Sequence, residues 1–395
     1  MDFSGIVDFI RSEFSDQENM IILHDPRFCG NERKYLMDAM DSNFVSSVGE
    51  YVNKFEKAVA EYTGSPFAVA AVNGTSALHI SLLLSGVHRD DEVITQPVSF
   101  IATCNAISYC GAHPVFVDVD RDTMGLSPEK LEDFLKNNSL KKADGFTYNN
   151  KTGRRFAAVV PMHTFGHPCR IDDIADICAR YNIPLVEDAA ESMGSFYKGK
   201  HTGCFGDFGA VSFNGNKIIT TGGGGMILTA DEEKAKLAKH ITTTAKVPHP
   251  WEYKHDYTAY NYRLTNLAAA LGCGQIEQLE KFVNIKRELA QKYSQFFNEI
   301  GVKFNIEPAD SRSNYWLMAV ILNDRSERDA FLTYTNEHKV MTRPIWILNN
   351  KLDMYAGCQC ADLSNAQWLE DRVVNIPSTV IIPDYYQNIT QGRYN

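Results

Sequence analysis

Short apolar runs alternate with helical stretches from about residue 65 onward, and this alternation constrains the fold more than any other feature. The sequence predicts strands at 67–72, 92–95, 114–119, 157–161, 184–187, 210–213 and 225–229, with helices at 76–85, 100–109 and 171–181 between them. Strands that alternate with helices indicate an α/β fold with a mostly parallel sheet covered on both faces. Ligands of such sheets bind at the carboxyl ends of the strands.

The last third of the chain follows a different pattern. Residues 264–297 predict one or two long helices, and shorter strand-like pieces beyond Gly301, such as 315–322, mix with a helix near 328–338. A chain of 395 residues has room for about two domains. We therefore expect an N-terminal arm and helix over 1–30, a large domain over 31–270, and a smaller α+β domain over 271–395.

Charge and cysteine content exclude several classes of protein. With 39 Lys and Arg against 49 Asp and Glu, the net charge is −10, whereas a nucleic-acid-binding protein needs a basic face for phosphates. No apolar run is long enough to span a membrane, and the N-terminus lacks a signal-peptide pattern. The 9 cysteines include no Cys-x-x-Cys pair, so we expect reduced thiols, no metal site and a cytoplasmic location.

The first candidate site feature is the turn Asn73-Gly74-Thr75-Ser76, between a strand and a helix. Glycine lets the backbone approach a ligand closely, and a helix N-terminus offers free N–H groups to an anion. The turn is therefore a candidate phosphate site, although taken alone it is more typical of an ordinary helix cap.

The second feature is the acidic segment 187–191, which closes an apolar strand with Glu187, Asp188 and Glu191. A carboxylate at a buried strand end is costly unless a cation pairs with it, and a protonated pyridine nitrogen would be such a cation. A metal-binding acid cluster or a structural salt bridge would explain the same segment.

The third and fourth features are Lys217 and Phe100. Lys217 lies between a strand end, Ser212-Phe213, and the glycine run 222–225, and a partly buried lysine can form an imine; a solvated turn lysine is the alternative. Phe100 follows the second strand and would stack on a flat ring, or belong to the core. The segments lack the order of a Walker A loop or a dinucleotide fingerprint. Together the four features are what pyridoxal phosphate needs from a protein.

At these residues the chain resembles the DegT/DnrJ/EryC1/StrS family of pyridoxal-phosphate sugar aminotransferases, over about residues 26–377. The motifs are Asn-Gly-Thr-Ser-Ala-Leu (73–78), Ser-Phe-Ile-Ala-Thr (99–103), Glu-Asp-Ala-Ala-Glu (187–191), Ser-Phe-Asn-Gly-Asn-Lys (212–217) and Tyr-Asn-Tyr-Arg-Leu-Thr-Asn (260–266). The resemblance implies the aspartate aminotransferase-like fold of type I pyridoxal-phosphate enzymes.

The resemblance also implies residue roles. Lys217 holds the cofactor covalently and moves protons, Asp188 pairs with the pyridinium nitrogen, Glu191 lies near the phenolic oxygen, and Phe100 stacks on the ring. Gly74, Thr75 and Ser212 hold the phosphate, Ser76 is a further cofactor-binding residue, and Asn261 reaches the phosphate of a neighbouring subunit's cofactor. That last role implies a homodimer.

The segment 214–221 with Glu191, and the tail segments 342–346 and 374–378, are similar to family members that act on UDP-linked 4-keto-6-deoxy-N-acetylglucosamine. The expected reaction moves an amino group from an amino acid, L-glutamate, to C4 of that sugar for surface glycan biosynthesis. His163, Arg312 and Arg343 are the candidate substrate-binding residues. The alternative for each arginine is a surface or salt-bridge role, and the alternative for His163 is a position in the core. The alternatives are a C3-keto or dTDP-sugar aminotransferase of the same family, and a non-catalytic binding or regulatory protein of the same fold.

Overall fold

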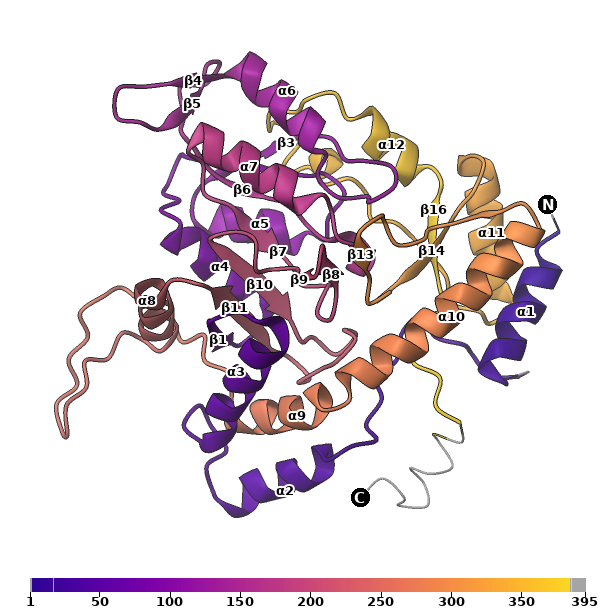
Figure 1. Ribbon diagram of the computed structural model, residues 1–395, viewed down its shortest axis with the longest axis horizontal. Helices are drawn as coiled ribbons and strands as arrows, with labels where there is room; N and C mark the ends of the chain where they lie inside the picture. The colour runs from indigo at the N-terminus through magenta and orange to yellow at the C-terminus, as the bar shows by residue number, and fades with distance from the viewer. Residues whose placement is uncertain (1, 17, 384, 386–395) are drawn as a thin grey trace.

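A computed structural model describes residues 2–16, 18–383 and 385, and it centres on one mixed sheet (Figure 1). Parallel bridges Val159–Leu185 and Met162–Asp188 join two smaller sheets into the strand order β1-β11-β10-β7-β6-β2-β3. The strands are β1 (Phe67–Ala71), β11 (Gly225–Thr229), β10 (Phe208–Ser212), β7 (Val186–Asp188), β6 (Phe156–Val160), β2 (Glu92–Thr95) and β3 (His113–Phe116). Among these described strands, β11 alone runs in the direction opposite to the other six, which confirms the predicted α/β fold.

Helices cover both faces of this sheet, because alternate strand residues point to opposite sides. Val69, Ala158 and Ile227 pack with α4, α5 and α8, whereas Val159 packs with α6 and α7, and Met226 with α3 and α9. The bounds are α3 (Glu50–Thr63), α4 (Gly74–Leu84), α5 (Ala102–Tyr109), α6 (Pro128–Asn138), α7 (Ile171–Tyr181), α8 (Glu232–Thr242) and α9 (Asn266–Ile276).

A second, smaller sheet of order β12-β14-β16-β15 forms the C-terminal part. Its strands and helices are β12 (Lys303–Phe304), β14 (Met318–Ile321), β15 (Arg343–Pro344), β16 (Val373–Ile376), α10 (Leu279–Glu299), α11 (Arg325–Glu337) and α12 (Ser364–Glu370). The N-terminal helix α1 (Ser4–Phe14) packs on this part, on the right of Figure 1, through Phe3 and Ile10. Residues 386–395 of the predicted small domain lie outside the described residues.

The predicted domain boundary at 270/271 falls inside α9. That helix packs against α2 (Glu32–Asp41) and α3, and therefore belongs with the large sheet, while α10 leads into the smaller one. The short elements are the hairpin β4 (Ser139–Lys141) and β5 (Thr147–Asn149), the small sheet of β8 (Phe196–Tyr197), β9 (Lys200–His201) and β13 (Ser311–Arg312), and the 3-10 turns at Thr164–Gly166 and Asn349–Lys351.

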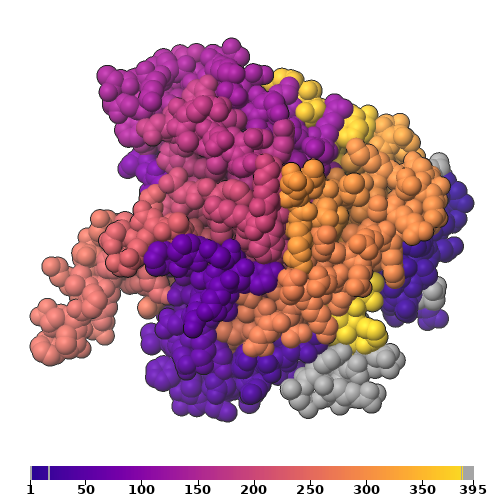
Figure 2. Space-filling model, viewed as in Figure 1, coloured from indigo at the N-terminus to yellow at the C-terminus, as the bar shows by residue number. Residues whose placement is uncertain are grey.

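One segment, residues 243–261, stands clear of the rest of the chain as an extended arm (Figures 1 and 2). The bridges Thr243–Asn261 and Lys246–His255 hold its two sides together, and its aromatic side chains Trp251 and Tyr253 are 76% and 81% exposed. None of the helices in the described part of the chain is long and apolar enough to cross a membrane.

Candidate active site

A cavity of about 700 Å³ opens at the carboxyl ends of β7 and β10, between the large sheet and the C-terminal part. The predicted site residues that line it are Gly74, Thr75, Phe100, Asp188, Glu191, Ser212, Lys217 and Arg343. The other wall consists mainly of apolar side chains, among them Trp316, Ile345 and Trp346. The strand order thus brings together residues that lie far apart in the sequence.

Lys217 lies between a carboxylate and an aromatic ring. Its side chain is 13% exposed, and Nζ is 3.4 Å from Oε1 of Glu191 and 3.8 Å from the centroid of the Trp316 ring. The amino group therefore points into the cavity and is largely shielded from water, which is what a covalent attachment point requires.

Asp188 is buried at the end of β7. Its Oδ2 accepts a hydrogen bond from the Thr103 hydroxyl at 2.6 Å, and its Oδ1 accepts one from the Ala190 N–H at 3.1 Å. Burial raises the pKa of this carboxyl, and the Thr103 hydrogen bond opposes that shift. Among the residues that the structure describes, none forms an ion pair with Asp188, so a protonated ring nitrogen in the cavity would supply the missing cation.

Glu191 faces Lys217 from the loop after β7. Burial raises the pKa of this carboxyl to about 7, although the charge of Lys217 lowers it in part. Its other oxygen, Oε2, accepts a hydrogen bond from the Phe165 N–H at 2.9 Å. A carboxyl with this pKa can exchange a proton near neutral pH.

The turn after β1 lets the N-terminus of α4 lie close to Ser212 at the end of β10. Asn73 caps α4 by accepting a hydrogen bond from the Ser76 N–H at 2.7 Å, so the helix N-terminus faces the cavity. A Cβ added at Gly74 would lie 2.8 Å from Cβ of Ser212, and one at Gly225 would lie 2.3 Å from the Asn73 carbonyl oxygen. The glycines therefore bring the helix N-terminus and Ser212 into one anion-binding pocket.

Phe100 is 53% exposed and lines the cavity, so its ring is free to stack on a ligand rather than belonging to the core. Arg343 is also exposed there; its guanidinium donates to Asn336 Oδ1 at 3.2 Å and to the Thr342 carbonyl at 3.0 Å.

The structure does not bring His163 or Ser76 into the cavity. His163 is fully buried, with Nε2 3.0 Å from Glu187 and Nδ1 3.6 Å from the Cys169 sulfur. Burial lowers the pKa of this imidazole, but Cys169 and Glu187 outweigh it and raise the pKa to about 10. Ser76 does not line the cavity, and its N–H is already bonded to Asn73. Neither residue is therefore placed to contact substrate or cofactor in this structure.

Arg312 and Asn261 also lie away from the cavity. Arg312 forms an ion pair with Glu280 and donates to Asn284 and to the Gly194 carbonyl, as in the alternative of a salt-bridge arginine. Asn261 is exposed at the base of the arm. Glu187 is an anchor rather than part of the site, because it accepts hydrogen bonds from the Gly203 and Gly206 N–H groups at 2.8 Å.

The alternative of a metal-binding acid cluster finds no support, because the described residues contain no group of three or more metal-binding side chains. The site residue that sequence reasoning missed is Trp316. A tryptophan at the start of a predicted strand carries no local signal that its ring lies over a lysine far away in the sequence.

Comparison with known proteins agrees with this geometry. The model of the DegT/DnrJ/EryC1/StrS aminotransferase family matches residues 28–388. The chain belongs to this family. It is similar to GDP-perosamine synthase of Escherichia coli O157:H7 (36% identical, covering 91% of this chain and 93% of the relative) and of Vibrio cholerae (34%, covering 91% and 94%). Among solved structures, the aminotransferase TlmJ from Streptoalloteichus hindustanus is 28% identical, with a TM-score of 0.83 over 95% of this chain and 98% of that one.

This DegT-family chain is a pyridoxal-phosphate-dependent nucleotide-sugar aminotransferase. The cavity fits the cofactor on its own chemistry. The buried carboxyl of Asp188 has no cationic partner among the described residues, an anion pocket lies at Gly74 and Ser212, and the amino group of Lys217 is enclosed by Glu191 and Trp316. These groups match a pyridinium nitrogen, a phosphate and an aldehyde respectively.

Proposed function

We propose that this enzyme transfers the amino group of L-glutamate to C4 of a 4-keto-6-deoxy sugar linked to a nucleoside diphosphate, and that Lys217, Asp188 and Glu191 carry the chemistry. The observation that supports this most is the convergence of these three side chains on one cavity beside an anion pocket. The presence of lysine at position 217 favours amino transfer, because family members that dehydrate their substrates have histidine at this position.

Each residue has one physical task. Pyridoxal phosphate, when bound, supplies an electron sink for the pair left behind when a proton leaves Cα of the donor. Lys217 binds the cofactor through Nζ, and once a donor amine takes its place, Nζ takes the Cα proton. Asp188 accepts the ring N–H and so keeps the ring cationic. Glu191, 3.4 Å from Nζ, stabilises the ammonium of Lys217 after the proton arrives.

For the sugar nucleotide we propose GDP as the first candidate. The two relatives above, at 36% and 34% identity over nine-tenths of the chain, carry the name GDP-perosamine synthase, which refers to a GDP-linked product. The sequence motifs instead favoured a UDP-linked N-acetylated sugar, so UDP is the second candidate. We propose that Arg343, an exposed cation of the cavity wall, binds the diphosphate of the sugar nucleotide.

The test of the function uses absorbance and turnover. The purified enzyme with pyridoxal phosphate should show a visible imine band that borohydride removes, and it should aminate one of a panel of 4-keto-6-deoxy sugars linked to GDP, UDP and dTDP, with 3-keto sugars as controls. Lys217→Ala and Lys217→Arg should lose both the band and turnover. Normal turnover in either variant would contradict the proposed role of Lys217.

We also propose a homodimer in which the arm of one subunit brings Asn261 to the other subunit's cofactor phosphate. The exposed arm and its exposed aromatic side chains support this. Mixing Lys217→Ala with Asn261→Ala chains should restore about a quarter of wild-type activity, because half of the dimers are hybrids and each hybrid has one site with both residues intact. Light scattering checks the mass, and absence of any restored activity would exclude a shared site.

A further inference from the structure

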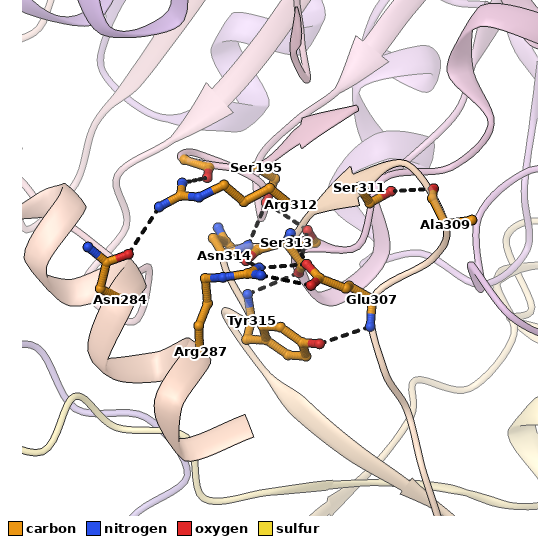
Figure 3. A network of polar contacts seen from close by, with 12 residues as sticks. Ser195, Asn284, Arg287, Glu307, Ala309, Ser311, Arg312, Ser313, Asn314 and Tyr315 are labelled. Carbon is orange, nitrogen blue, oxygen red and sulfur yellow. Dashed lines mark hydrogen bonds and ion pairs between the residues drawn. The ribbon is translucent and has the colours of Figure 1, made fainter. Parts of the chain in front are cut away.

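Asn314 connects two separate parts of the wall around Lys217. It is fully buried between β13 and β14, in the polar network of Figure 3. Its side-chain Nδ2 donates to the carbonyl oxygens of Glu191 and Met193, each at 2.9 Å, and its Oδ1 accepts the N–H of Trp316 at 2.8 Å. One amide therefore uses both its donors and its acceptor on the segments that carry Glu191 and Trp316.

Those two segments are the two sides of the Lys217 site. Glu191 Oε1 lies 3.4 Å from Nζ on one side, and the Trp316 ring centroid lies 3.8 Å from Nζ on the other. Trp316 also donates its indole N–H to the carbonyl of Asn216, the residue before the lysine, at 2.7 Å. The position of the ammonium thus depends on how far apart Glu191 and Trp316 are held.

The backbone around Asn314 is shaped to receive it. Gly166 has φ +95°, and a Cβ there would lie 1.8 Å from Asn314 Oδ1, so only glycine fits. The Ser195 and Ser313 hydroxyls both donate to the Gly166 carbonyl, at 2.7 and 2.9 Å, and Ser195 accepts the Asn314 N–H at 2.9 Å. Phe165, next to this glycine, donates its N–H to Glu191 Oε2.

The outer edge of the network is fixed by an ion pair. Arg287 on α10 bonds both carboxylate oxygens of Glu307, and Glu307 accepts the Ser313 N–H at 2.8 Å (Figure 3). The backbone on either side of Asn314 is therefore held from the C-terminal part of the chain, while its amide reaches into the loop after β7.

We propose that Asn314 is a positioning residue: it sets the distance between Glu191 and Trp316 and thereby holds the Lys217 ammonium in place whenever the lysine is not joined to the cofactor. This inference rests on the role proposed for Lys217. Asn314 touches neither the cofactor site nor Lys217 itself, and it acts through the two residues that do.

The experiment compares Asn314→Ala with Ser195→Ala. Both remove buried hydrogen bonds of the same network, but within the part of the chain that the structure describes the Ser195 side chain bonds neither Glu191 nor Trp316, so it serves as the matched control. The full-length enzyme is reconstituted with pyridoxamine phosphate, which leaves Lys217 free, and is labelled briefly with acetic anhydride. Mass spectrometry then gives acetylation of Lys217 relative to that of Lys57, an exposed lysine on α3.

Asn314→Ala should raise the labelling ratio of Lys217 to Lys57 by about tenfold. Contact with an aromatic face and a carboxylate favours the shielded position of a partly desolvated ammonium by about this factor, and the variant loses that protection from acetylation. It should also lower kcat with the KM of both substrates nearly unchanged. Ser195→Ala should lower the melting temperature but leave the ratio within about twofold of wild type. If Asn314→Ala does not fold, Asn314→Ser, which has one O–H in place of two N–H donors and so cannot keep both bonds, is measured by the same criteria.

Equal labelling ratios and equal kcat in the Asn314 and Ser195 variants would overturn the inference. That outcome is distinct from failure of the proposed function, which would show as turnover and an imine band surviving in Lys217→Ala. A rise in KM without a change in the labelling ratio would likewise contradict a positioning role, since it would place the defect in substrate binding.

Discussion

Because the carboxyl of Glu191 is buried, its ionisation lowers the free energy of unfolding of the protein as the pH rises. Burial raises its pKa from 4.5 to about 7. The unfolded chain loses this proton near pH 4.5, while the folded chain keeps it until about pH 7. Folding is therefore most favourable below pH 4.5 as far as this group is concerned, and its contribution is lost as the pH rises to 7.

The size of the effect follows from the shift. A change of about 2.5 pKa units corresponds to about 3 kcal/mol over the whole window, since each unit is worth about 1.4 kcal/mol. Glu191→Gln removes the titrating group but keeps the shape. The difference in free energy of unfolding between variant and wild type should therefore move in favour of the variant by about 2 to 3 kcal/mol between pH 5 and pH 8.

Urea unfolding of the cofactor-free protein at several pH values measures this difference, because Lys217 then remains free to contact Glu191. Glu61→Gln, a change on the exposed surface of α3, is the matched control and should follow wild type at every pH. If the Glu191→Gln and wild-type curves run parallel from pH 5 to pH 8, then Glu191 does not titrate in this range and the reasoning is refuted.

Two further substitutions test the cofactor site. Asp188→Asn keeps the Thr103 contact but removes the negative charge, so kcat should fall by at least about a hundredfold while the imine band of Lys217 remains. Stopped-flow turnover measures kcat, and the visible spectrum measures the imine band. An unchanged kcat would contradict the role of Asp188. Gly74→Ala would place a Cβ 2.8 Å from Cβ of Ser212, so the anion pocket must widen. An absorbance titration should then show that pyridoxal phosphate binds at least about tenfold more weakly. An unaltered affinity would exclude a phosphate at this turn.

The sequence predicted the cofactor side of the cavity because its residues obey local rules. Gly74 and Lys217 follow short apolar strands and Asp188 is the last residue of one, and parallel strands end at the same edge of the sheet. Their types also limit what they can do: a glycine before a helix, an acid at a buried strand end and a lysine before a glycine run. Type and position together were sufficient to place them in one site.

The C-terminal wall was not predictable in this way. Arg312 and Arg343 look alike as sequence, yet Arg312 is paired with Glu280 whereas Arg343 lines the cavity. The difference arises from the side chains that the fold places next to each arginine, and the local sequence does not indicate which side chains these are. For the same reason the connection from Asn314 to Glu191 and Trp316 depends on three-dimensional contacts.

The choice between a site role and a core position for His163 could not be made from sequence for a related reason. A histidine that follows a strand at the correct edge of the sheet resembles a site residue, but this ring turns away and is buried against Glu187 and Cys169. The strand end fixes the backbone position, whereas the rotamer and the neighbours decide whether the side chain reaches the ligand.

The packing of α1 has a consequence for the order in which the chain folds. Phe3 contacts Phe331 with ring centroids 5.3 Å apart, and Ile21 pairs with Val340, so residues on either side of α1 have partners more than three hundred residues later in the sequence. Contacts of such long separation form late, because the chain entropy lost in closing the loop must be overcome first. The apolar face of α1 is therefore covered only once the C-terminal part has formed, and until then it stays exposed to contacts with other apolar surfaces.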